Sequence, residues 1–176
     1  MGKLNIWKII RDHFSTFRNY TTGDRSLMDF AVFLGVPLAV AGFLLWRGIN
    51  FKPPVLSGML SAFSIFAGLL LNLLLLICGF TTNERFSGND PATTTRRNFL
   101  REVYFNLAFS ILVALVIVAL DLATVAVVDE HGTYRTITFV LGFLIVQFVL
   151  TIVMVLQRIH TLLAFEFQRP GLRKSA

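Results

Sequence analysis

Few side chains in this sequence combine polar chemistry with a position inside a long apolar run. Asp121 is an acid in such a run, Asn106 is an amide in the same run, and Asn72 and Gln147 are amides in two others. An ionisable group within a membrane helix marks a candidate ion path, and a buried amide must find an interhelical partner or face water. These residues therefore point to ion movement or to contacts between membrane helices.

Asp121 needs separate treatment because of its depth. It lies 18 residues beyond Val103, which is about 27 Å along a helix and places it near the outer interface. There it can reach water, or pair with Arg135 or Arg47. A structural salt bridge and a role in an ion path are both open interpretations.

Enzyme chemistry finds little support. His13, His131 and His160 are far apart in the sequence, and no zinc-protease motif, paired intramembrane acids, nucleophile elbow or phosphate-binding glycine loop occurs. We therefore expect no catalytic residue, no metal and no cofactor. The single cysteine, Cys78, excludes a disulfide within the chain.

Small and polar residues recur at three-and-four spacing in three apolar segments, which lines them up on one side of each helix. In lipid, such residues supply helix contacts through close packing and hydrogen bonds. An ordinary bundle core is the plainer interpretation, and a pore or cavity lined by several copies is the alternative. The residues expected at helix–helix or oligomer interfaces are Ser57, Ser61, Ser64, Gly68, Asn72, Asn106, Ser110, Gln147 and Thr151.

The elements that must position these residues are membrane spans. The chain has 176 residues, 55% of them hydrophobic, and a mean hydropathy of +0.71, too apolar for a soluble domain of this length. The run 55–80 holds 26 residues without a charge, about 39 Å as a helix against a bilayer core of about 30 Å. We predict an all-α, polytopic membrane protein with one transmembrane domain over 27–168. Its four spans are expected at about 27–46, 55–80, 103–128 and 136–157.

The two ends of the chain are basic. Residues 1–20 set Trp7, Ile10 and Phe14 at helical spacing against Lys and Arg, which predicts an amphipathic interfacial helix with Trp7 in the headgroup region. A soluble helix packed on a partner or on cytoplasmic loops is the alternative. Residues 169–176 form a basic cytoplasmic tail.

Charge sets the orientation. The formal net charge is +6, and 13 of the 16 Lys and Arg residues lie beside one end of the spans. This bias puts both termini and the middle loop in the cytoplasm. The surplus is expected to contact anionic headgroups rather than nucleic acid. The residues expected to touch lipid or a cytoplasmic partner are Arg96, Arg97, Arg101 and Arg158.

This layout, with the segments Ser64 to Leu76 and Phe148 to His160, resembles small four-span membrane proteins of bacterial phage-defence systems. Among them it is most similar to the membrane subunit of the Kiwa system (KwaA-type). The resemblance implies an inner-membrane homo-oligomer that senses membrane perturbation by phage and recruits a cytoplasmic effector.

Three functional hypotheses follow. The first is a sensor or scaffold in antiphage defence, with a soluble cytoplasmic protein docking on Arg96 and Arg97. The second is an oligomeric ion channel or membrane-disrupting effector lined by the polar stripes, with a tetramer as the first expectation. The third is a small-solute transporter, although small multidrug transporters of this size use a carboxylate at mid-depth.

Overall fold

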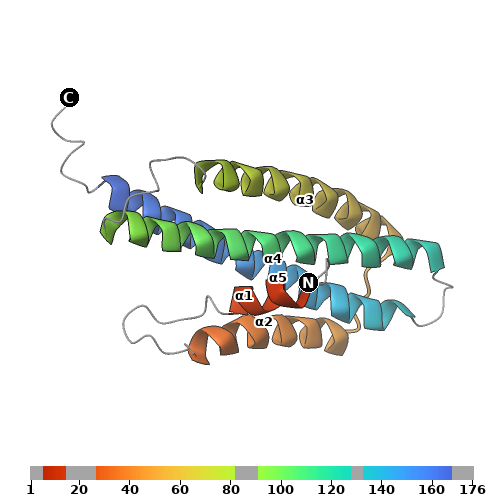
Figure 1. Ribbon diagram of the computed structural model, residues 1–176. Helices are drawn as coiled ribbons and strands as arrows, with labels where there is room; N and C mark the ends of the chain where they lie inside the picture. Colours follow the sequence, from red (N-terminus) through yellow and green to blue (C-terminus); the bar gives the residue numbers. More distant parts are fainter. Residues whose placement is uncertain (1–5, 15–26, 82–90, 128–132, 168–176) are drawn as a thin grey trace.

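The computed structural model describes residues 6–14, 27–81, 91–127 and 133–167, and all its regular structure in these ranges is helical. The helices are α1 (Ile6–Phe14), α2 (Leu27–Trp46), α3 (Pro53–Thr81), α4 (Pro91–Val127) and α5 (Thr133–Phe167) (Figure 1). The prediction of an all-helical protein is confirmed for this part of the chain. The tail 169–176 lies outside it.

Three of these helices hold segments long and apolar enough to cross a membrane: Pro53–Gly79 in α3, Arg97–Thr124 in α4 and Arg135–Thr161 in α5. The apolar part of α2, Ala31–Trp46, is shorter. At 1.5 Å per residue it reaches about 24 Å, less than the roughly 30 Å of a bilayer core. The structure therefore shows three helices of spanning length and one shorter apolar helix that occupies the predicted first span.

Local sequence sets where the helices begin and end. Gly48 closes α2 with a φ of 66°, and the Gly48 and Ile49 amides donate to the Leu45 and Leu44 carbonyls at 3.2 and 3.0 Å. Glycine takes this left-handed conformation at no steric cost, and the two bonds satisfy carbonyls that the helix end leaves open. Helix α4 begins at Pro91. Proline suits the first turn of a helix, because it has no amide hydrogen to leave unsatisfied there.

The long helices pack side by side in the order α3, α4, α5, α2 (Figure 1). Aromatic and branched side chains fill the core between them, and the Phe63 ring of α3 meets the Phe148 ring of α5 edge to face with centroids 5.2 Å apart. The buried residues of one core cluster are Leu56, Phe63, Ala67, Phe109, Val113, Ala114, Ile117, Leu141 and Phe148, and those of a second are Ile77, Val103, Leu107 and Val155. The fourth helix of the row, α2, packs mainly on α5, so α2 and α4 form separate walls.

The N-terminal helix occupies the space between those walls. Figure 1 shows α1 lying between α2 and α4, beside the middle part of the long helices. Ile9 and Ile10 pack against the core, whereas Trp7 is 73% exposed. The structure thus places the apolar side of α1 on α4 and turns Trp7 outward, and the position of α1 at a membrane interface stays a prediction. The remainder of the predicted 1–20 helix, residues 1–5 and 15–20, lies outside the described part.

A single glycine sets the distance between α2 and α5. A Cβ added to Gly142 would lie 2.8 Å from the Leu44 Cδ1 atom and 3.9 Å from the Ala41 Cα atom. Ala41 is fully buried at this crossing. Small residues permit such close backbone approach in apolar surroundings, where packing contributes most of the association free energy.

We predict that Gly142→Ile separates α2 from α5 and destabilises the protein by about 1–3 kcal/mol, because the extra atoms overfill a packed contact. Gly142→Ala should be tolerated better, since Leu44 can rotate its terminal methyl group away. Thermal unfolding in detergent measures both effects. The matched control is Gly35→Ile, because no atom lies within 4 Å of a Cβ at Gly35. An equal loss of stability in the control would contradict the assignment.

Candidate functional site: the pocket beneath helix α1

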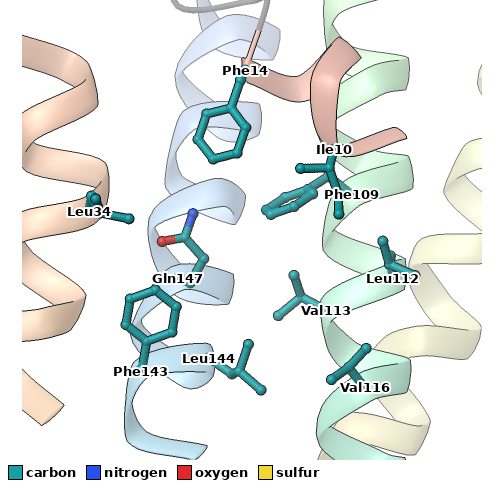
Figure 2. Close-up of a pocket in the computed structure, with 10 residues that line it drawn as sticks. All are labelled: Ile10, Phe14, Leu34, Phe109, Leu112, Val113, Val116, Phe143, Leu144 and Gln147. Atoms are coloured by element: carbon teal, nitrogen blue, oxygen red, sulfur yellow. The ribbon is translucent and has the colours of Figure 1, made fainter. Parts of the chain in front are cut away.

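A pocket of about 270 Å³ lies where α1, α2, α4 and α5 meet, and we call it the α1 pocket. Its walls are apolar except for one amide side chain. Figure 2 shows the lining residues, with α2 on one side, α4 on the other, and α1 across one end. They are Ile10, Phe14, Leu34, Phe109, Leu112, Val113, Val116, Phe143, Leu144 and Gln147.

A buried polar contact positions α1 over this pocket. The His13 Nδ1 atom lies 2.8 Å from the Asn106 Oδ1 atom, and both residues are fully buried. Because the amide oxygen only accepts, Nδ1 carries the proton and donates it. The imidazole also stacks on the Phe109 ring of α4, with centroids 3.9 Å apart and planes 5° from parallel. On the α2 side, the Phe33 ring centroid lies 5.8 Å from it.

These surroundings keep the imidazole neutral. The pKa of His13 is lowered from 6.5 to about 4, mainly because burial removes the hydration of the charged ring. The hydrogen bond to Asn106 opposes this effect, and the positive charge of Arg158 adds to it. A charged imidazole would lose its hydration in this site without gaining an anionic partner from Asn106. The docked position of α1 therefore requires His13 without its second proton.

Gln147 is the polar side chain of the pocket wall. It is only 5% exposed, and its Oε1 atom has no hydrogen-bond partner among the described residues. Figure 2 shows the amide directed into the pocket, between α2 and α4. A buried amide left in this state costs about 1–3 kcal/mol, so the site favours a ligand group that can hydrogen-bond with it.

The other predicted interface residues of α4 and α5 are satisfied within their own helices. Ser110 donates to the Asn106 carbonyl at 3.0 Å, and Thr151 donates to the Gln147 carbonyl at 2.8 Å. Both residues are fully buried. They permit close packing of the helices, and their hydroxyl groups already donate to carbonyls of their own helices.

The predicted stripe on α3 faces the opposite way. Its members Ser57, Ser61, Ser64, Gly68 and Asn72 are exposed, and the three serines donate to carbonyls of their own helix at 2.7 to 3.1 Å. The side of α3 that packs on the bundle carries Leu56, Phe63 and Ala67. The three stripes therefore do not meet in one interior within a single chain, because α3 buries its larger apolar face. Contact between copies through this stripe stays a prediction.

Asp121 is fully buried, and neither carboxylate oxygen has a hydrogen-bond partner among the described residues. The expected routes to water or to an arginine are therefore not seen in one chain. Arg135 instead donates to the Leu45 carbonyl at 3.4 Å, and Arg47 is exposed. An ion-path role for Asp121 stays a prediction.

The predicted cytoplasmic arginines whose side chains the structure describes have different surroundings. Arg158 on α5 forms a salt bridge with Glu102 on α4, so this cation takes part in the contact between the two helices. Arg97 and Arg101 are exposed, and the Arg101 guanidinium lies 5.6 Å from the Phe105 ring centroid. The Arg96 side chain lies outside the described part. Within that part, no group of three His, Cys, Asp or Glu side chains gathers in metal-binding geometry.

These features define a class: a helical protein with apolar helices of spanning length and a largely apolar pocket under a short N-terminal helix. A scan of protein-family models and searches of curated proteins and of solved structures find no match to this chain.

Sequence reasoning missed two residues of this region. His13 was considered only as a catalytic candidate, although it follows Ile9 and Ile10 by four and three residues and so shares their helix face. Gly142 was not singled out in the fourth span. A histidine in register with buried isoleucines was the available signal, and for the glycine the sequence offered none.

We predict that acid releases α1. Below pH 6.5 the released His13 gains a proton that the docked residue takes up only near pH 4. The contribution of neutral His13 to the free energy of docking is therefore fully present above pH 6.5. It falls by on the order of 3 kcal/mol as the pH falls towards 4. Fluorescence of Trp7 in a Trp46→Phe variant reports this change, since the chain has 2 tryptophans. His13→Phe should remove the pH response, and an identical response in that variant would sink the idea.

Proposed function

We propose that this protein is a membrane-embedded sensor in which α1 is the moving element. The observation that carries the proposal is that α1 is held against the long helices by a neutral, buried histidine while its outer side carries charge. His13 bonds to Asn106 on α4, and Lys8 and Arg11 on the other side of α1 are exposed.

The depth of α1 makes this arrangement sensitive to its surroundings. Ile10 of α1 lines the same pocket as Gln147, which is near the middle of the apolar segment Arg135–Thr161. An exposed cation near the centre of a bilayer costs about 2.5–3.5 kcal/mol on insertion scales. In the headgroup region the same amphipathic helix meets water and anionic lipid. The buried contacts of α1 therefore favour the docked position, whereas its exposed cations favour the released one.

A change in the bilayer can shift this balance, because a two-state element responds to any difference in its interaction with the two states. Thinning or disturbance of the membrane near α1 brings water to Lys8 and Arg11. Release of α1 then changes the cytoplasmic surface that Arg97 and Arg101 help to form, and a soluble partner recognises that change. We place α2, α3, α4 and α5 across a bacterial inner membrane with both termini cytoplasmic. The resemblance to phage-defence proteins makes phage perturbation the expected trigger.

The test measures the depth of Trp7 in vesicles. In the Trp46→Phe variant, quenching by lipids brominated at different chain positions should change when the vesicles swell in hypo-osmotic buffer. Asn106→Leu removes the acceptor of His13, so Trp7 should take the released depth before swelling. A Trp7 depth that neither swelling nor Asn106→Leu alters would rule out the sensor mechanism.

A second function, an oligomeric pore, is favoured by the exposed stripe on α3. Gly68 has no atom within 4 Å of an added Cβ, so a large residue there fits within one chain. Asn72 is exposed on the same side, and contact with other copies would shield it from lipid.

We predict that Gly68→Leu prevents assembly while leaving the fold of each chain intact. Native mass spectrometry in detergent measures assembly, and ion flux from liposomes measures the pore. Ala62→Leu is the matched control, because Ala62 is also exposed on α3 but lies on its other exposed flank. Normal assembly of the Gly68 variant would mean that the stripe faces lipid and lines no pore.

A further inference from the structure

We propose that the α1 pocket binds a fatty acid in its uncharged form, with the carboxyl group hydrogen-bonded to the Gln147 amide. The proposal rests on the proposed function in one respect, since it names a ligand for the pocket that the sensor helix covers. The pocket is formed by the described residues of four helices.

Gln147 supplies the polar group that would bind the ligand. Its side chain is 5% exposed, its Oε1 atom has no partner among the described residues, and it points into the pocket (Figure 2). A primary amide offers an acceptor oxygen and an N–H donor along one edge. A protonated carboxyl group offers the complementary pair, an O–H donor beside a carbonyl acceptor. The two planar groups can therefore form two parallel hydrogen bonds.

The apolar walls of the α1 pocket determine the charge state of the ligand. None of the residues that line the pocket is ionisable, and three of them are phenylalanines, Phe14, Phe109 and Phe143. An ionised carboxylate in such a site would lose its hydration without a cation to replace it. Binding therefore requires the acid to keep its proton, which burial itself favours.

Size and access indicate a lipid chain. The cavity is about 270 Å³, whereas an apolar cavity of roughly 150 Å³ holds a benzene molecule. It therefore holds a carboxyl group and the first part of a chain. Leu34 on the α2 wall and Val116 on the α4 wall are each 40% exposed. The pocket thus opens sideways between α2 and α4 onto the surface where lipid lies, and the rest of the chain can extend there.

The experiment measures binding of radiolabelled palmitic acid to the full-length protein in phosphatidylcholine nanodiscs. We expect saturable binding to the unmodified protein. Methyl palmitate, which has no O–H donor, should bind the unmodified protein at least about tenfold more weakly than the acid does. The variant Gln147→Leu should bind palmitic acid more weakly by a similar factor, as expected for the loss of one or two hydrogen bonds. Val116→Trp should abolish binding by filling the cavity. Leu115→Trp should not, because Leu115 is exposed on α4 and does not line the pocket.

Three outcomes would overturn the proposal: uptake that only follows lipid partition, equal affinity for the acid and its methyl ester, or unchanged affinity in the folded Gln147→Leu variant. Different outcomes decide between the ligand assignment and the sensor mechanism. If Trp7 stays at one depth while palmitic acid binds as described, the ligand assignment stands and the moving helix does not. If Trp7 moves on swelling but palmitic acid does not saturate, the ligand assignment is wrong and the sensor stands.

Discussion

The position of α1 depends on the contact between His13 and Asn106. Two polar side chains meet between apolar helices, where each would be costly to bury alone, and the His13 Nδ1 atom donates to the Asn106 Oδ1 atom at 2.8 Å. Stacking of the imidazole on Phe109 adds aromatic packing to the same point. The contact positions α1 between α2 and α4, and α1 in turn closes one end of the pocket. It also makes the arrangement conditional, because the imidazole must stay neutral.

The polar residues of the long helices divide into two groups by what their side chains can reach. The hydroxyl groups of Ser110 and Thr151 donate to carbonyls one turn earlier in their own helices, so they need nothing from outside. The amides of Asn106 and Gln147 extend further and carry both a donor and an acceptor. Asn106 receives its partner from α1, whereas the Oε1 atom of Gln147 faces the pocket without one among the described residues. Recognition in this site therefore depends on amides.

Packing between the long helices explains why a pocket exists at all. Gly142 lets α2 approach α5 closely, and this draws α2 to that side and away from α4. α1 occupies one end of the space between the two walls, and the pocket lies beside it. A short helix at the end of an apolar groove both limits the pocket and leaves its flank open towards lipid.

The sequence by itself determined the helices, since their causes are local. Run length predicted the long apolar segments, and Asn106 and Gln147 were already candidates for interior contacts. Only the tertiary structure decided which face each helix buries. Lipid is as apolar as Leu or Phe, so hydropathy does not distinguish the face of α3 with Phe63 from the stripe with Gly68. Likewise, the spacing of Ile9, Ile10 and His13 defines a face of α1, but only a contact 93 residues away in the chain shows that the face meets Asn106.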